Sequence, residues 1–445
     1  MNPSEKLASF IAETTDDQVP QKVFDKSMWP ILDGLAVTLA GYSHEVGRTI
    51  VPFVRDIGGA PAATVLVDGH RTSAPLAAYA NGTMCHALDY DDMSVTMGGH
   101  PTAPVLSATL AVGEMVRASG RQFLLAYILG VEVENKLGRA IIDIHYNLGW
   151  HPTVTLGVFG ATAACCKLLG LDAEKTLMAL GIAGSEASGL KQNFGTMTKS
   201  LHVGQAAKNG VLAAMLASRG WTADRRILEG HFGFCNLFCG RGQYNLQDMT
   251  DHLGNPWVIQ DPGFTLKKYP CCHSIHSSLD AMFDLLDERP LRADQISRVE
   301  CRVDADRVHV LVHPRPTTGL EAKFSLEYCL AAAILDGRIS LAQFEDHKVL
   351  GGPIRDLIPR IEASKDDTLE DWVCRIRVET VDGQVLSRQS GRTPGITRWE
   401  DLAAKFRDCA TPALSPDQTE RALIMIQKVE EMADISDLVQ SVVRA

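Results

Sequence analysis

Two histidines, His100 and His151, are each followed by Pro-Thr and then by a long apolar, alanine-rich stretch. Proline disfavours the helical conformation in the residue before it and is well tolerated in the first turn of a helix. Each histidine is therefore predicted to lie just outside a helix N-terminus, where free backbone N–H groups and the helix dipole attract anions. The repeat indicates a site for an anionic, carboxylate-like ligand.

Acidic residues gather in the segment His86-Ala87-Leu88-Asp89-Tyr90-Asp91-Asp92, which closes a predicted helix that begins near Pro75. Carboxylates at this spacing could bind a divalent metal, supply a catalytic base or form a solvated helix end. The residue types alone leave all three interpretations open.

Basic residues form a second group, in a helix that Thr198 or Ser200 is expected to cap and that runs to Ser218. This cap places Lys199 and His202 in the first turn, where a cation opposes the helix dipole. A lysine at that position in an acidic protein suggests a bound anion that compensates it. An exposed surface lysine is the alternative.

A third segment, Leu266-Lys267-Lys268-Tyr269-Pro270-Cys271-Cys272-His273-Ser274-Ile275-His276, lies where a smaller domain is expected to begin. Clefts between domains favour ligand sites, although the lysines could also be solvated linker charges. The cysteines and histidines are close neighbours instead of spaced ligands, which argues against a metal cluster. Later, Phe324-Ser325-Leu326-Glu327-Tyr328 opens a helix, and its tyrosine is either a ligand contact or a packed core aromatic.

Composition excludes several classes of function. The 445 residues carry a formal net charge of −11, which disfavours nucleic acids and anionic membrane surfaces as partners. No apolar run approaches the roughly 18 to 20 residues of a membrane span, and the polar start is unlike a signal peptide. We therefore expect a cytoplasmic protein without membrane partners, whose eleven scattered cysteines are reduced thiols.

Apolar residues at helical spacing dominate the chain from Ser4 to about Ser218, with one short strand expected at Ala63–Val67. Alanine and glycine on several faces predict closely packed, buried helices. The long helices are expected at Pro101–Arg117, Arg121–Ile144, Thr153–Leu169 and Ala173–Ala187.

After about Pro262 the pattern changes. Ile296–Val303 and Trp372–Thr380 alternate apolar and polar residues, as half-buried strands do, with a hairpin turn at Val381-Asp382-Gly383-Gln384 and a helix at Leu326–Leu335 between them. Trp399–Val443 returns to helix, with Ser415-Pro416-Asp417 as a start signal. These patterns predict a mainly α fold. A large all-helical domain, residues 1–265 and 395–445, holds an inserted smaller α+β lid domain, residues 266–394.

The motifs, taken in order, resemble those of the MmgE/PrpD family, which includes 2-methylcitrate dehydratase, cis-aconitate decarboxylase and iminodisuccinate epimerase. They are His86-Ala87-Leu88-Asp89-Tyr90-Asp91-Asp92, Gly99-His100-Pro101-Thr102, Gly149-Trp150-His151-Pro152-Thr153, Lys199-Ser200-Leu201-His202, Lys267-Lys268-Tyr269-Pro270 and Phe324-Ser325-Leu326-Glu327-Tyr328. The resemblance implies a homodimer with a cofactor-free, metal-free active site between its domains. The site residues that it implies are Asp89, His100, His151, Lys199, Lys267 and Tyr328. His202 and His273, within or beside these motifs, are expected to bind substrate.

One position departs from the pattern, because Met93 stands where the dehydratases and decarboxylases of the family have threonine. The stretches Gly98-Gly99-His100-Pro101 and 193–199 are more similar to the iminodisuccinate epimerase branch. The substrate therefore stays open within the family.

The family reactions share a carbanion or enediolate beside a carboxylate. Lys199 and Lys267 fit the stabilisation of its charge, His100 and His151 fit proton transfer, and Asp89 could orient or activate a histidine. We expect a lyase or isomerase that acts on a small di- or tricarboxylate by α-proton abstraction. Dehydration and epimerisation are both open. Decarboxylation of the cis-aconitate type is the alternative, because Met93 removes a hydroxyl group.

Two rival functions remain. A helical terpenoid-type enzyme would use Asp89–Asp92 to hold magnesium and diphosphate, but it needs a second metal-binding motif that the sequence lacks. A noncatalytic carboxylate-binding protein explains the helices but not the lysine and histidines gathered at helix starts. The sequence also lacks spaced Cys/His ligand sets and glycine-rich phosphate loops, so no cofactor is expected.

Overall fold

A computed structural model describes residues 1–304, 307 and 310–444 of the chain, with the side chains of residues 142 and 143 left aside. The chain forms two compact units. The helical unit contains Met1–Asn193, Met197–Leu266 and Ile396–Ala445, and the mixed unit contains Phe194–Thr196 and Lys267–Gly395. Both ends of the chain therefore contribute to the helical unit.

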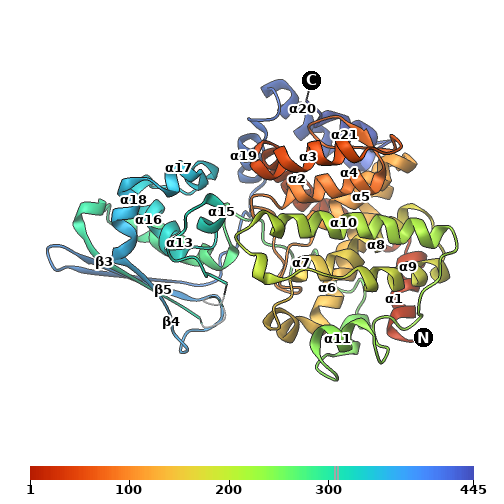
Figure 1. The fold of residues 1–445 in the computed structure, drawn as a ribbon, viewed down its shortest axis with the longest axis horizontal. Helices are drawn as coiled ribbons and strands as arrows, with labels where there is room; N and C mark the ends of the chain where they lie inside the picture. Colours follow the sequence, from red (N-terminus) through yellow and green to blue (C-terminus); the bar gives the residue numbers. More distant parts are fainter. Residues whose placement is uncertain (305–306, 308–309, 445) are drawn as a thin grey trace. The chain divides into compact units, whose positions relative to one another are not determined.

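The helical unit consists mainly of α-helices joined by loops, and Figure 1 labels most of these helices. A two-residue hairpin of strands β1 (Ala63–Thr64) and β2 (Arg71–Thr72) interrupts them. The helices are α1 (Pro3–Glu13), α2 (Gln21–Ser43), α3 (Glu45–Ile57), α4 (Ala74–Cys85), α5 (Thr102–Val116), α6 (Gly120–Asn147), α7 (Pro152–Thr155), α8 (Gly157–Leu168), α9 (Ala173–Glu186), α10 (Met197–Ser218), α11 (Phe234–Cys239), α12 (Leu246–Thr250), α19 (Trp399–Ala410), α20 (Pro416–Gln427) and α21 (Ser436–Ser441).

Helix α10, the long yellow-green helix of Figure 1, packs against α4, α8 and α9. Its glycines allow this close approach. A Cβ added at Gly204 would lie 2.1 Å from Thr83 Oγ1, and one added at Gly210 would lie 2.5 Å from Ala161 Cβ. The predicted close packing of glycine- and alanine-rich helices is confirmed. It brings the end of α4, which the acidic loop follows, next to the start of α10, which carries Lys199.

The predicted long helices are confirmed with one difference, and the predicted strand is shorter than expected. The segment expected as Thr153–Leu169 is broken at Leu156 into α7 and α8. The strand expected at Ala63–Val67 pairs with β2 only over its first two residues, and Val67 forms a separate bridge with Val443. Elsewhere, the start signal at Ser415 is confirmed, because its side chain caps α20.

The expected cap of α10 is wrong. The helix begins at Met197, so Thr198 and Ser200 lie inside it. Gly195, two residues before the helix, has a φ of 86°, a left-handed conformation that an α-helix cannot include. The helix therefore starts directly after this turn. Lys199 lies in the first turn as predicted, and His202 lies one turn later.

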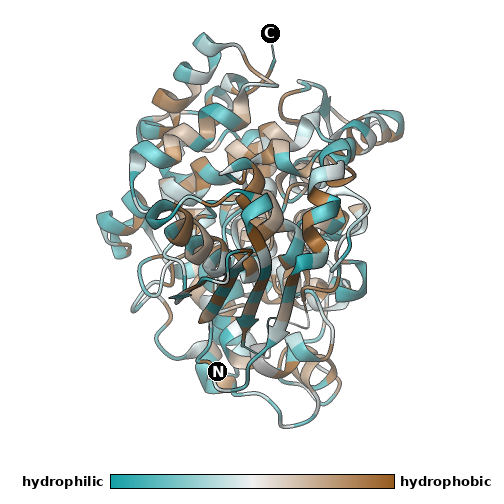
Figure 2. Cartoon of the chain, turned by 90° about the vertical axis from the view of Figure 1, so that its left-hand side faces the viewer, coloured by the Kyte–Doolittle hydropathy of each residue, from teal (hydrophilic) through white to brown (hydrophobic). Residues whose placement is uncertain are grey.

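The mixed unit contains a four-stranded sheet with the order β4-β3-β5-β6. Strand β3 (Ile296–Val303) is parallel to β4 (Ile361–Lys365) and antiparallel to β5 (Cys374–Thr380), which pairs with β6 (Val385–Ser390). Alternation along β3 and β5 buries one face of the sheet, and teal and brown bands follow the strands in Figure 2. The predicted hairpin turn joins β5 to β6, with Gly383 at a φ of 84°.

Helix α13 (His273–Glu288) packs against β5, β6 and α16 (Leu326–Asp336). The described residues of this unit also include the short helices α15 (Gly319–Ala322), α17 (Asp346–Val349) and α18 (Gly352–Leu357). Among the residues described here, no helix is both long and apolar enough to cross a membrane.

Candidate active site

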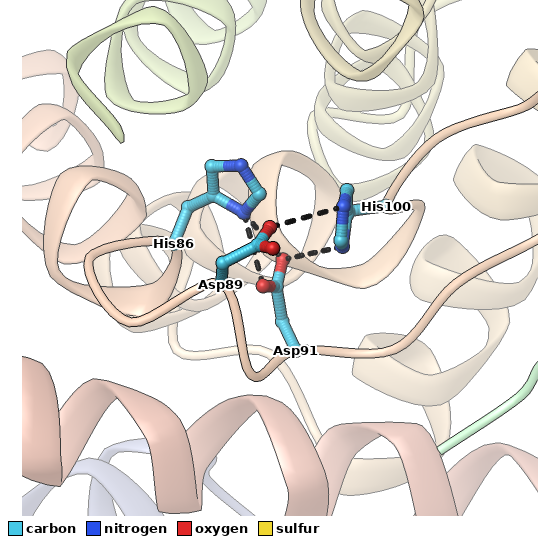
Figure 3. A group of neighbouring side chains, drawn as sticks. All are labelled: His86, Asp89, Asp91 and His100. Carbon is cyan, nitrogen blue, oxygen red and sulfur yellow. Dashed lines mark hydrogen bonds and ion pairs between the residues drawn. The ribbon is translucent and has the colours of Figure 1, made fainter. Parts of the chain in front are cut away.

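The loop that follows α4 carries the acidic motif. His86 caps the end of the helix. The backbone of Asp89 has a φ of 50°, a conformation that residues other than glycine rarely adopt. The side chains of Asp89 and Asp91 both reach His100, as Figure 3 shows. The left-handed turn therefore directs two carboxylates into one cluster, and both are buried.

His86 connects this loop to Lys199. Its Nδ1 lies 2.8 Å from Asp91 Oδ2, and its Nε2 lies 2.7 Å from Lys199 Nζ. An ammonium group can only donate, so Nε2 accepts from Lys199 and Nδ1–H donates to Asp91. Burial lowers the pKa of His86, an effect that Asp91 opposes and Lys199 reinforces. The hydrogen bonds thus match a neutral imidazole of defined tautomer.

Lys199 bridges α10 and the acidic loop. Its Nζ donates to Asp89 Oδ1 at 2.7 Å as well as to His86, and its side chain is 7% exposed. The dipole of α10 disfavours a cation in its first turn. The carboxylate of Asp89 supplies the compensating negative charge, so the protein itself holds the ammonium group in place.

His100 faces the same two carboxylates from the other side. Its Nε2 lies 3.5 Å from Asp89 Oδ1, and its Nδ1 lies 3.4 Å from Asp91 Oδ2. Its ring is 4.6 Å from that of His86, and its side chain is 12% exposed. Two acids beside one imidazole stabilise the imidazolium that would form when His100 accepts a proton.

His151, in the second repeat, has different neighbours. It takes the extended conformation predicted from Pro152, with φ −96° and ψ 97°, and it is 2% exposed. Its Nδ1 lies 3.3 Å from Nδ1 of His202. Burial lowers the pKa of His151 well below its ordinary value, with Lys199 as the next cause, and burial also lowers the pKa of His202 to about 4. Both imidazoles are therefore neutral near pH 7.

The two His-Pro-Thr segments are in direct contact. The backbone N–H of His100 donates to Thr153 Oγ1 at 3.2 Å. A Cβ added at Gly99 would lie 2.9 Å from the backbone nitrogen of Thr153, so only glycine permits this approach without a shift. The helical unit thus brings together five of the predicted site residues, Asp89, His100, His151, Lys199 and His202. A shared anion pocket for the two repeats remains a prediction.

Three predicted site residues belong to the mixed unit. Lys267 is buried near its start, and His273 is the first residue of α13, with its ring 5.2 Å from that of Trp372. Tyr328 is fully buried on α16, and its hydroxyl donates to the carbonyl of Gln343, as a core aromatic does. The roles proposed for these three residues stay predictions.

The sequence places His86 and Asp91 in the acidic motif but does not predict that their side chains pair. The missing signal is geometric. His86 ends α4, and Asp91 follows five residues later, so a tight turn is needed to pair their side chains. The sequence shows Thr153 only as part of the repeat, whereas in the structure its hydroxyl accepts a hydrogen bond from the backbone N–H of His100.

The cluster also resembles a metal site, because ligand atoms of His86, Asp89, Asp91 and His100 lie within 4.8 Å of one another (Figure 3). Two imidazoles and two carboxylates are ligands that zinc and related ions accept. Lys199 already donates to two of these four residues at 2.7 Å, so its ammonium group would repel an entering cation. The residues fit an internal lysine better than a metal, and independence from metals stays a prediction.

The chain is similar to known proteins over nearly its whole length. Residues 5–247 match the family model for the MmgE/PrpD N-terminal domain, and residues 269–431 match that for the C-terminal domain. The cis-aconitate decarboxylase of Mus musculus is 28% identical over 98% of this chain and 92% of its own length. That of Homo sapiens is 29% identical over 98% and 93%. The 2-methylcitrate dehydratase of Escherichia coli K12 is 23% identical over 65% of this chain and 62% of its own.

Proposed function

The chain belongs to the MmgE/PrpD family, and we propose that it is a lyase or isomerase of a small di- or tricarboxylate. The proposed reaction passes through a carbanion or enediolate beside a carboxylate. Relatives named as a decarboxylase and a dehydratase support lyase chemistry, and they are named for small carboxylic acids.

The observation that carries the proposal is the cluster of Lys199, Asp89 and His100. A preorganised ammonium group in a site that excludes water can stabilise developing negative charge by several kcal/mol. Lys199 is such a group, at 7% exposure and 2.7 Å from Asp89. It is suited to contact the oxygen on which the charge of an enediolate develops.

We assign proton transfer to His100, because Asp89 and Asp91 lie 3.5 and 3.4 Å from its two nitrogens. These carboxylates stabilise the imidazolium in the way that the aspartate of a catalytic triad does. His151 is suited to a different task. Because its imidazole stays neutral, it can donate a hydrogen bond to a substrate or accept one from it without adding charge.

Proton abstraction leading to dehydration or epimerisation is the primary proposal, and decarboxylation is the second candidate. The cis-aconitate decarboxylases of mouse and human each cover 98% of the chain, whereas the dehydratase covers 65%. Met93 lacks the hydroxyl that the resemblance leads one to expect, and its backbone pairs with Thr265. All three proposed reactions pass through a carbanion or enediolate beside a carboxylate, so the same cluster is suited to each of them.

Proton NMR in deuterium oxide distinguishes these reactions. Purified protein is incubated with cis-aconitate, 2-methylcitrate and iminodisuccinate in turn. We expect one of these acids to show deuterium exchange at an α-carbon, formation of an alkene or loss of carbon dioxide, and Asp89→Asn to abolish the change. Binding of these acids without any of the three changes would contradict the proposal and favour a noncatalytic carboxylate-binding protein.

A further inference from the structure

A buried ion pair adjoins the loop that carries Asp89 and Asp91. Lys405 of α19 and Asp33 of α2 place Nζ and Oδ1 2.7 Å apart, and their side chains are 2% and 0% exposed. The two helices pack against each other within the helical unit. A buried ammonium group is costly without a counter-charge, and Asp33 supplies that charge.

Lys405 also holds Tyr90, the residue between the two acids. Its Nζ donates to the backbone carbonyl of Tyr90 at 2.8 Å. The same nitrogen lies 3.6 Å from the centre of the Tyr90 ring, in the arrangement of a cation–π contact. One cation therefore fixes both the backbone and the side chain of a single loop residue.

The acidic loop contains a residue in a rarely populated conformation, so its shape depends on contacts such as the one with Lys405. Asp89 has a φ of 50°, and such a conformation persists only where the surroundings determine it. The far end of the loop is held separately, because Asp92 accepts from the hydroxyl of Thr102 at 2.6 Å and from its N–H at 3.2 Å. Lys405 holds the middle, between the two carboxylates that contact His100.

We propose that Lys405, paired with Asp33, is a positioning residue that fixes Tyr90 so that Asp89 and Asp91 keep their contacts with Lys199, His86 and His100. The inference rests on the proposed function only for its kinetic readout. It links α19, more than three hundred residues further along the chain, to the geometry of the acidic loop.

The test uses the double variant Asp33→Asn/Lys405→Met, which removes both charges and so leaves no buried charge unpaired. The chain offers a matched control, the buried pair of Glu132 and Lys136 at 3.5 Å, both 1% exposed. Lys136 donates to the carbonyl of His252, outside the acidic loop. Glu132→Gln/Lys136→Met therefore removes a comparable buried pair elsewhere in the same unit.

The first readout does not depend on substrate. In ¹⁵N-histidine NMR, the Nδ1 proton of His86 reports its hydrogen bond to Asp91. We expect this resonance to shift or to be lost to exchange with water in the Asp33/Lys405 variant and to stay unchanged in the control. An unchanged resonance in a folded Asp33/Lys405 variant would overturn the proposal, whether or not the proposed function holds.

The second readout is kinetic, on whichever acid of the panel is turned over. We expect kcat to fall at least about tenfold in the Asp33/Lys405 variant with KM changed less than about threefold. The control should keep the wild-type kcat. Equal melting temperatures in the two double variants, together with wild-type kcat in both, would show that the Lys405 pair is only structural.

Discussion

The two His-Pro-Thr segments have the same tripeptide and opposite surroundings. His100 lies 3.5 and 3.4 Å from the carboxylates of Asp89 and Asp91. His151 is 2% exposed, and its Nδ1 lies 3.3 Å from Nδ1 of His202. A local motif therefore places an imidazole beside a helix start, and distant elements decide its chemistry. His100 is suited to carry a proton, and His151 is suited to remain neutral.

The largest expected effect comes from Lys199→Met, which removes the cation that pairs with Asp89 beside His100 and that also acts on His151. Asp89 loses its partner at 2.7 Å, and a bound anion loses its counter-charge. We expect kcat/KM to fall about a thousandfold or more, with KM raised as well, because the charge acts in the ground state and the transition state. Steady-state kinetics measure this.

The matched control for that variant is Lys208→Met on the same helix. Lys208 is half-buried and lies 5.1 Å from the ring of Tyr79. It should keep wild-type kinetics. A similar loss of kcat/KM in both variants would mean that removal of any lysine from α10 damages the fold. That result would contradict a specific role of Lys199.

Replacement of His100 and of His151, singly and together, tests whether both histidines take part in catalysis. We expect His100→Gln and His151→Gln each to lower kcat about a hundredfold or more, with melting temperatures nearly unchanged. The double variant should lose much less than the product of the two, because residues that act together are non-additive. Histidines that only satisfy helix ends would give the opposite result, an unstable fold whose surviving protein keeps its specific activity.

A smaller effect is expected from Gly99→Ala, which pushes the two segments apart. The new Cβ would lie 2.9 Å from the backbone nitrogen of Thr153. Overpacking of this kind costs about 1 to 3 kcal/mol of folding free energy, and kcat should fall about tenfold as His100 moves. Gly352→Ala is the control, since nothing lies within 4 Å of its added Cβ. Urea unfolding and kinetics of both variants test this, and equal stabilities would contradict the close contact.

The smallest expected effect is on the pH dependence of stability, which tests whether His151 is neutral in the folded chain. Burial places the pKa of His151 well below 6.5 in the folded chain, so below about pH 6.5 the unfolded chain binds more protons. The free energy of unfolding is therefore fully retained above this pH and falls as the pH falls. His151→Gln should make the decline in melting temperature between pH 6.5 and 4.5 shallower. A slope as steep as that of the wild type would contradict a buried neutral His151.

Local signals in the sequence account for much of the fold. The long helices, strand β3 and the turn between β5 and β6 follow from periodicity and turn residues, and Ser415 marks the start of α20 through its side-chain cap. The start of α10 was misplaced because Gly195 ends the preceding turn, a conformation that hydroxyl caps do not reveal.

The candidate site was only partly predictable. Asp89, Lys199 and the two repeated histidines stand out by type and position, since each adjoins a helix end. The pairing of His86 with Asp91 was not foreseen, because it depends on a left-handed turn at Asp89. The contact of Lys405 with Tyr90 depends on tertiary packing across 315 positions, which no local pattern encodes.

The most direct test of the central claim is proton NMR in deuterium oxide of whichever acid of the panel, cis-aconitate, 2-methylcitrate or iminodisuccinate, is converted, with wild-type protein compared with Asp89→Asn. Asp89 joins Lys199 to His100, so its neutral replacement removes the charge that couples them. We predict that the wild type converts this acid, seen as deuterium exchange at an α-carbon, formation of an alkene or loss of carbon dioxide, and that Asp89→Asn does so at least about a hundredfold more slowly while remaining folded. Equal rates for the two proteins would contradict the assignment of this cluster as the active site.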